Sequence, residues 1–247
     1  LRAFQGQNWK VPMVFADVET TGLSPDQDRI VEIGGVRYDG EGNYEGSFHC
    51  YTDPGIPIPD EAAAIHGISD SKMREMLDNG QAVPLSRSVM RSFARFCRGA
   101  VFVAHNGTVF DRLFIDRECN RHRIPTITDE VGGLDTLHMA RMRWPGCRVS
   151  LDDLCSRTGI DRSMRADAHG ALLDSVLLAS IFPRMMMAED NTLLSQIVVS
   201  GPLSMSNGDG LTGAHAGRPA DRLLWSASPD EVSRSEAINQ EVCKKWK

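Results

Sequence analysis

The amino-acid sequence predicts an α/β protein in which consecutive strands come first and helices alternate with strands afterwards. Short apolar or alternating segments separated by turn residues fill its N-terminal part, and helical periodicity appears only after them. The 247 residues suit one sizeable domain with an appendage better than two equal halves. With 41% hydrophobic residues and 22 glycines the composition is that of a globular protein. No apolar window approaches the length of a membrane span.

Three strands are expected in the N-terminal part. Residues 11–17 form an apolar run that ends in an acid, residues 30–38 alternate in polarity, and residues 44–51 follow the turn sequence DGEGN. Hairpin-type connections join these segments, so we expect three antiparallel neighbours in one sheet.

The rest of the main domain is predicted to alternate between helices and strands. A helix is expected over 84–98, because Pro84 suits the first helical position and Gly99 suits the end. An apolar strand follows at 100–105. The remaining periodic segments predict helices at 110–121, 150–158 and 168–188 and a short strand at 131–135.

Composition divides the chain into three parts, with the main domain over 1–190. Residues 191–221 are predicted to be a linker or long loop, because Gly, Ser, Asn and Pro dominate from about residue 200. Residues 222–247 are predicted to form a short strand and a helix, since Ser228 and Glu231 match a capping box. We expect this C-terminal segment to act as a docking element.

The net charge of -6 limits how the chain could bind nucleic acid. Proteins that hold phosphates by surface charge normally carry a basic face, so cations or partners would have to assist. The six cysteines include no CxxC pair, which favours neither a disulfide scaffold nor a zinc site and indicates an intracellular compartment. The sequence does not distinguish cytosol, nucleus and organelle matrix. The chain begins with Leu1 rather than a methionine, so a presequence that directs import into an organelle is not excluded.

Asp17 and Glu19 lie two residues apart at the end of the first predicted strand. Alternation along a strand places both carboxylates on one face of the sheet. Like charges brought together repel unless a cation neutralises them, so the pair favours a divalent metal with oxygen ligands. Taken alone, such a pair is about as often a solvated acidic strand end as it is a metal site. The adjacent turn, residues 20–23 (TTGL), has small side chains that let a terminal nucleotide approach the backbone closely.

Three further residues have the chemistry of such a site. Asp111 begins a predicted helix just after the strand 100–105, where an acid is also favoured by the helix dipole alone. His169 and Asp174 lie five residues apart on the predicted helix 168–188, within reach of one pocket. Taken singly, His169 is more typical of a polar helix start than of a base. The joint pattern is much stronger than any one of its members.

Six segments spread over roughly residues 10–185 resemble a known enzyme family. They resemble the 3′→5′ exonucleases with four carboxylates and one histidine, and among these the epsilon proofreading subunit of bacterial replicative DNA polymerases. The segments are FADVETTGL (15–23), VEIGGV (31–36), IHGISD (65–70), VAHNGTVFD (103–111), WPGCRVSLDDLC (144–155) and AHGALLDSVLLA (168–179). HGALLD joined to DxETTG at this distance is the most specific part of the match.

The resemblance implies a ribonuclease-H-like fold, with a five-stranded mixed sheet flanked by helices and followed by a C-terminal extension. It implies two Mg²⁺ or Mn²⁺ ions, about 4 Å apart, that activate a water and neutralise charge at phosphorus. It also implies His169 as general base and release of nucleoside 5′-monophosphates. The tail WSASPDEVSRSEAINQEV (225–242) is faintly similar to the part with which epsilon engages its polymerase, which implies that the C-terminal segment docks onto a polymerase or a larger complex. The implied metal ligands are Asp17, Glu19, Asp111 and Asp174, and the implied substrate contacts are Thr20, Thr21, Gly22, Leu23, His66 and Asn106.

Three functions stay open at this point. A DNA 3′→5′ exonuclease that proofreads or trims ends comes first, because the motifs match the epsilon subunit. An RNA 3′ exonuclease comes second, since the same site hydrolyses either backbone and contacts to the 2′-hydroxyl decide between them. HNGTVFD is also one residue longer than in the epsilon subunit and resembles the mammalian three-prime repair exonucleases. A non-catalytic docking module comes third, although such a module has no need for clustered acids.

Overall fold

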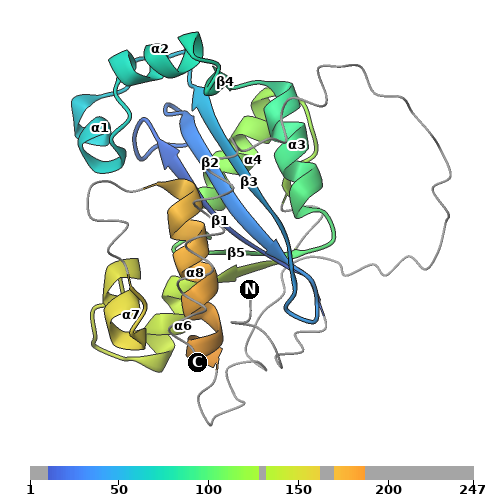
Figure 1. The fold of residues 1–247 in the computed structure, drawn as a ribbon, viewed down its shortest axis with the longest axis vertical. Coiled ribbons are helices and arrows are strands. Elements are labelled where there is room, and N and C mark those ends of the chain that lie inside the picture. The colour runs from blue at the N-terminus through green and yellow to red at the C-terminus, as the bar shows by residue number, and fades with distance from the viewer. Residues whose placement is uncertain (1–10, 128–131, 162–169, 187–247) are drawn as a thin grey trace, which may run out of the picture.

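A computed structural model describes residues 11–127, 132–161 and 170–186 of the chain. Its centre is a six-stranded mixed sheet with the strand order β4-β3-β2-β1-β5-β6 (Figure 1). The sheet has six strands rather than the five expected, because a short strand, β4, adds to the edge of β3. The strands are β1 Met13–Thr20, β2 Ile30–Tyr38, β3 Tyr44–Asp53, β4 Ala82–Pro84, β5 Val101–Ala104 and β6 Gly133–Asp135.

The predicted antiparallel meander is confirmed. β2 pairs antiparallel with both β1 and β3, while β5 lies parallel to β1 on its other side and β6 lies parallel to β5. The pairing of β1 with β2 shifts register after Glu19, where Thr20 pairs with Ile30 and Val31 is skipped. Such an irregularity ends regular pairing and redirects the chain, so β1 leaves the sheet just after its two acidic residues.

Seven described helices surround the sheet. They are α1 Asp60–His66, α2 Asp70–Asp78, α3 Arg87–Cys97, α4 Asp111–Arg121, α6 Thr136–Arg143, α7 Leu151–Thr158 and α8 Ala171–Met186. The predicted start of α3 at Pro84 is wrong, because Pro84 pairs with Asp53 as the last residue of β4 and Ser86 precedes the helix. None of the described helices has the length and apolar character that crossing a membrane requires.

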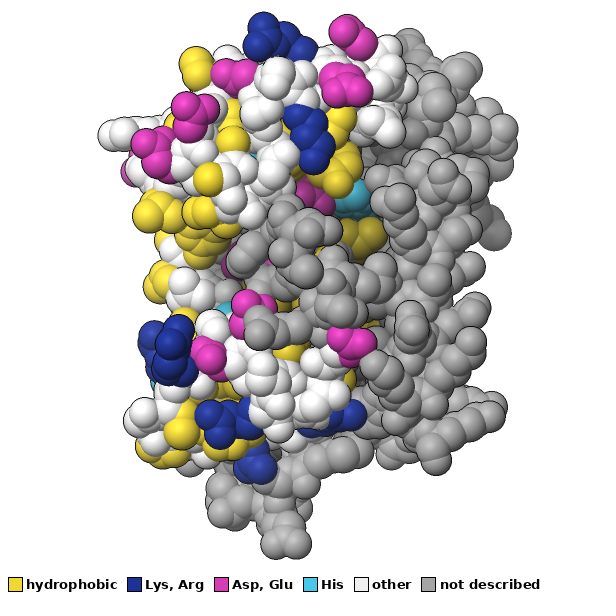
Figure 2. All heavy atoms as spheres, turned by 60° about the vertical axis from the view of Figure 1, so that its left-hand side comes forward, with side chains coloured by type: hydrophobic (Ala, Val, Ile, Leu, Met, Phe, Trp, Pro, Cys, Tyr) yellow, Lys and Arg dark blue, Asp and Glu magenta, His cyan; other side chains and the backbone are white. Residues whose placement is uncertain are grey.

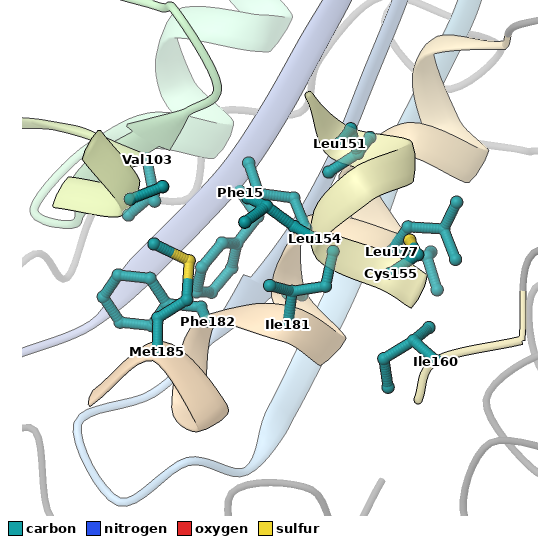
Figure 3. Packing of buried hydrophobic residues seen from close by; sticks show 14 of the residues in the cluster. Phe15, Val103, Leu151, Leu154, Cys155, Ile160, Leu177, Ile181, Phe182 and Met185 are labelled. Carbon is teal, nitrogen blue, oxygen red and sulfur yellow. The ribbon is translucent and has the colours of Figure 1, made fainter. Parts of the chain in front are cut away.

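Helices cover both faces of the sheet. Val14 and Ala16 of β1 face a core shared with α3 and α4, whereas Phe15 faces a core shared with α6, α7 and α8. Figure 3 shows Phe15 beside Phe182 of α8, and their rings meet edge to face with centroids 5.2 Å apart. Figure 1 shows α8 lying across the sheet, with α1 and α2 at one end of it. The α8 face is the one that carries the acidic residues of β1.

The predicted linker and C-terminal segment, 191–221 and 222–247, lie outside the described residues, and so does His169.

Candidate active site

Two strand carboxylates and one helix carboxylate meet on the α8 face of the sheet. Asp17 and Glu19 alternate with buried Val18 along β1, so both point to the side on which Phe15 packs against α8. Asp174 lies in the first turn of α8 and is buried. Carboxylate oxygens of these three residues all lie within 4.8 Å of one another. The structure therefore brings together three of the predicted metal ligands.

Gly34 of β2 allows α8 to approach the sheet this closely. It pairs with Asp17 across the strands and sits directly under the first turn of α8. A Cβ atom at this position would collide with the backbone of Ala171 and Leu172. Since any other side chain would push the helix outward, the missing Cβ sets the distance between Asp174 and the carboxylates of β1.

The fourth acid, Asp111, reaches the site from the opposite layer of helices. It is the first residue of α4 and is only 2% exposed. Its Oδ1 accepts a hydrogen bond of 3.1 Å from the backbone N–H of Val18, which lies between Asp17 and Glu19. Asp111 is thereby fixed to the strand that carries Asp17 and Glu19, although its oxygens are not among those that lie within 4.8 Å of one another, and its role as a metal ligand stays a prediction.

Burial and mutual repulsion shift the proton equilibria of this cluster. Burial raises the pKa of Asp111 to about 7; the hydrogen bond from Val18 opposes the shift, and the charges of Asp135 and Asp174 add to it. The pKa of Asp17 is raised well above its usual value, first by burial and then by the neighbouring charges of Asp111, Asp174, Glu19 and Glu32. A divalent cation would relieve this repulsion, because opposite charge favours the ionised form of each carboxyl group.

The oxygen donors fit a hard divalent cation. Mg²⁺ and Mn²⁺ prefer carboxylate and water ligands, and the cluster offers carboxylates from β1 and α8, with Asp111 of α4 hydrogen-bonded to Val18 between Asp17 and Glu19. No described cysteine belongs to this cluster. Cys97, Cys119 and Cys155 lie in the two cores, Cys50 packs against one of them, and Cys147 is exposed.

The cluster opens into a cavity of about 600 Å³. Besides the acids, the cavity wall is formed by the turn after β1, by α1, by His105 and by the start of α7. In Figure 2, acidic and histidine side chains are visible in the hollow of this face, with apolar side chains gathered beside it. The lining residues are Asp17, Val18, Glu19, Thr20, Thr21, Gly22, Leu23, Pro59, Glu61, Ala62, Ile65, His66, His105, Phe110, Ser150, Leu151, Asp152 and Asp174.

The chain matches an exonuclease family, RNase T, over residues 14–182. This match covers both core layers and all the carboxylates described above. The chain belongs to the RNase T exonuclease family. It is therefore a nuclease that hydrolyses phosphodiester bonds, and the family predicted from the sequence motifs is confirmed.

Curated relatives and solved structures agree with this exonuclease assignment. A DNA polymerase III subunit epsilon of Rickettsia typhi is 37% identical over 172 residues, 68% of this chain and 71% of that protein. The protein of the same name from Pasteurella multocida is 35% identical over 181 residues, 71% of this chain and 68% of that protein.

Two solved exonucleases show the same fold at low identity. E. coli exonuclease I in complex with a dA16 oligonucleotide matches with a TM-score of 0.60 and 20% identity, over 75% of this chain but only 42% of that chain. Exonuclease X in complex with 5′ overhanging duplex DNA matches with a TM-score of 0.51 and 22% identity, over 77% and 99% of the two chains. The predicted ribonuclease-H-like fold is thus confirmed for this exonuclease.

The turn after β1 is held rigidly in the exonuclease by Asp28. Asp28 accepts hydrogen bonds from the Thr21 hydroxyl, at 3.1 Å, and from the Ser24 amide, at 2.9 Å. A Cβ on Gly22 would overlap the Asp28 carboxylate, so only a glycine leaves room for Asp28 in this position. Leu23 projects from this braced turn with 85% of its surface exposed, on the cavity rim. An apolar side chain held in the open suits contact with a nucleotide base.

The other predicted substrate residues differ in where they lie. His66 ends α1, is 4% exposed and lines the cavity, and its Nδ1 accepts a 3.1 Å hydrogen bond from the Ile68 amide. Asn106 is not among the lining residues. It adopts a left-handed backbone conformation, φ 70°, and its backbone N–H donates a hydrogen bond of 3.1 Å to Oδ1 of Asp135. In the described structure Asn106 shapes the loop before Asp111.

Sequence reasoning missed His105 and Asp135. His105 lines the cavity, and its Nδ1 lies 3.0 Å from the hydroxyl of Thr136. Asp135 accepts from the amides of Asn106 and Thr108 and from the first amides of α6. The signal for His105 was present, because it precedes Asn106 in the VAHNGTVFD segment. Asp135 gave only the local signal of an acid before a helix, since its bonds to Asn106 and Thr108 join it to a distant segment.

Proposed function

We propose that the chain is a divalent-metal-dependent 3′→5′ exonuclease that acts on DNA ends and releases nucleoside 5′-monophosphates. The observation that carries this proposal is the convergence of carboxylates from β1 and α8 at an open cavity, with the α4 carboxylate of Asp111 bonded to the same strand, in a chain of exonuclease ancestry. Such a cluster has no packing purpose, because buried like charges destabilise a fold unless a cation neutralises them.

Asp17, Glu19, Asp111 and Asp174 are proposed to hold two Mg²⁺ or Mn²⁺ ions. When bound, these ions supply an activated water and neutralise charge at the phosphate. The protein side chains fix the positions of the ions, and the Val18 amide orients Asp111 for this purpose. We assign His169 the role of general base that accepts the proton of the attacking water, a role for which a histidine near neutral pKa is suited.

The terminal nucleotide is proposed to occupy the cavity beside the turn after β1. Thr20, Thr21, Gly22 and Leu23 line that side, and His66 lines the end formed by α1. Asn106 is proposed to act through the loop that precedes Asp111. DNA is favoured over RNA because the relatives are subunits of a DNA polymerase and the similar structures contain DNA.

We further propose that the chain proofreads or trims DNA together with a polymerase. The support is the name of its relatives, DNA polymerase III subunit epsilon. Residues 222–247 are the segment we assign to docking, because a separate element after a linker can bind a partner without blocking the cavity.

Incubation with end-labelled nucleic acids tests the proposed activity. The full chain is incubated with 5′-labelled single-stranded DNA, a primer duplex with a 3′ mispair, and single-stranded RNA, in Mg²⁺ or Mn²⁺. We expect stepwise 3′ shortening of both DNA substrates and little shortening of RNA. Asp17→Ala should lose at least about a thousandfold in rate, because one change removes both a ligand and its charge.

The outcomes separate the competing functions. Faster shortening of RNA would replace DNA by RNA as the substrate. Failure to shorten any substrate with either metal would leave the docking module as the function. The role of His169 is tested by the pH profile of kcat: an ascending limb near neutrality should disappear in His169→Ala, and an unchanged profile removes this residue as the base.

A further inference from the structure

A buried glutamate and histidine form a pair on the sheet beside the acidic cluster. Glu32 Oε1 of β2 lies 2.8 Å from His49 Nε2 of β3, and their side chains are 3% and 7% exposed. The ring of Tyr51 packs edge to face against His49, with centroids 4.7 Å apart. A carboxylate is almost never buried this fully without a partner, so the histidine holds it in place.

Strand register places this pair next to the metal-ligand candidates. Glu32 is directly opposite Glu19, and Gly34 is directly opposite both Asp17 on one side and His49 on the other. Residues opposite each other in antiparallel strands point to the same face of the sheet. Glu32 and His49 therefore lie on the α8 face. Burial is the main cause of the raised pKa of Asp17, and the charge of Glu32 contributes to it.

Glu32 also lies near Gly170, the residue that precedes α8. A Cβ on Gly170 would lie 3.9 Å from Glu32 Oε1, and Gly170 is the residue whose carbonyl accepts the 2.9 Å hydrogen bond from the Asp174 amide. The first turn of α8, which carries Asp174, thus packs on Gly34 through Ala171 and Leu172, and the residue before it lies near Glu32. A shift of Glu32 would be transmitted to Asp174 within a single helical turn.

Packing alone does not require charged groups at this place. Burial of an ionic or polar pair is often no more stabilising than an apolar pair of the same volume. A carboxylate fixed beside metal ligands, in contrast, strengthens cation binding through its negative charge and the orientation it imposes on the ligands.

We propose that Glu32, held by His49, is a positioning residue of the divalent-metal site. Its carboxylate does not bind the ion; it adds negative charge beside Asp17 and Glu19 and supports the first turn of α8. This inference rests on the metal dependence of the proposed function and adds to it a residue pair outside the four predicted ligands.

Mn²⁺ binding by the full chain tests this role without relying on turnover. Glu32→Gln keeps the shape and the hydrogen bond and removes the charge. We expect its Mn²⁺ dissociation constant, measured by calorimetry, to rise about tenfold, and the Mn²⁺-induced rise in Tm to shrink accordingly. Glu118→Gln is the matched control, because Glu118 is equally buried but pairs with Arg29 and Arg121 in the opposite helix layer. It should lose stability while keeping the wild-type dissociation constant.

Variants of His49 provide the second arm. His49→Ala should weaken Mn²⁺ binding in the same direction, and His49→Gln, which retains an N–H donor, should recover most of the affinity. Wild-type affinity in both Glu32→Gln and His49→Ala, or an equal loss in Glu118→Gln, would reduce the pair to a structural role and overturn the inference. A wild-type chain that binds no Mn²⁺ overturns the proposed metal dependence as well, so the two failures are distinguishable.

Discussion

Asp111 couples the stability of the metal-free protein to pH. Its pKa is about 7 in the folded state, mainly because of burial, against 3.8 for the unperturbed group. A carboxyl group with a raised folded-state pKa stabilises the fold fully below the unfolded pKa, and this stability is lost as pH rises through the folded pKa. The free energy of unfolding in EDTA should therefore fall by on the order of a few kcal/mol between about pH 4 and pH 8.

Asp111→Asn should reduce this pH dependence, because an amide cannot ionise yet can still accept the hydrogen bond from Val18. The part that remains belongs to Asp17, whose pKa is also raised. Urea unfolding in EDTA at several pH values measures the effect. Addition of Mn²⁺ at pH 8 should restore more stability to the wild-type chain than to the variant, since the cation replaces the proton as the neutralising charge and the variant keeps only Asp17, Glu19 and Asp174 as ligands. If the free energy of unfolding of Asp111→Asn falls as steeply with pH as that of the wild type, groups other than Asp111 cause the pH dependence.

At the same scale, the sequence predicted the acidic cluster well and its surroundings poorly. Strand alternation indicated Asp17 and Glu19, whereas Asp111 and Asp174 were indicated only by the joint pattern and by the resemblance to the exonuclease motifs. The pair of Glu32 and His49 has no local signature, because its members come from different strands and meet only through register. His169 is a prediction that the described residues do not reach.

The elements of the fold were predictable to different degrees. The meander and α4, α7 and α8 followed from clear periodicity, whereas α1, α2, α6 and β4 were missed. α1 has seven residues and α6 eight, and helices this short depend on tertiary packing more than on propensity. Strand β4 has three residues, and its Pro84 was assigned to the following helix. The missed α1 carries His66, so one wall of the cavity appeared only in the structure.

The contact of β2 with α8 gives a prediction at the scale of elements. Gly34→Ala inserts a methyl group against the backbone of α8 and should destabilise the fold by about 3 kcal/mol. Because α8 carries Asp174, nuclease activity should fall more than the loss of folded protein explains. Thermal unfolding and turnover at a temperature where the variant is folded measure the two effects.

Gly35→Ala is the control for this change on the same strand. Its Cβ would face α3 and lie 3.2 Å from a ring carbon of Phe96, a side chain that can move. We expect a smaller loss of stability, about 1 kcal/mol, and normal specific activity. Equal loss of activity in both variants would show that the distance of α8 from the sheet does not determine the site.

At the scale of the whole molecule, net charge and site charge act together. The chain has a net charge of -6, and its cavity is lined by acids, so a bare cavity repels phosphates. Single-stranded DNA should therefore bind at least about tenfold more tightly in Ca²⁺ than in EDTA. Fluorescence anisotropy with a short labelled oligonucleotide measures this difference, since Ca²⁺ occupies carboxylate sites yet often supports little hydrolysis.

A double substitution distinguishes repulsion of DNA by the acidic side chains from bridging of DNA to these side chains by a bound ion. Asp17→Asn with Asp174→Asn removes two charges, so its DNA affinity in EDTA should exceed that of the wild type, and Ca²⁺ should add little. Wild-type DNA binding that is indifferent to Ca²⁺ would place the main phosphate contacts outside the acidic cavity.

The carboxylate of Asp135 has a consequence for the loop that precedes Asp111. It ties the amides of Asn106 and Thr108 to the start of α6, and Asp111 is tied separately to β1 through Val18. The few residues between these anchors form a span clamped at both ends. A residue can therefore be inserted or removed between Thr108 and Asp111 without moving the acidic cluster, so the length of this loop beside the cavity can change while the carboxylates keep their geometry.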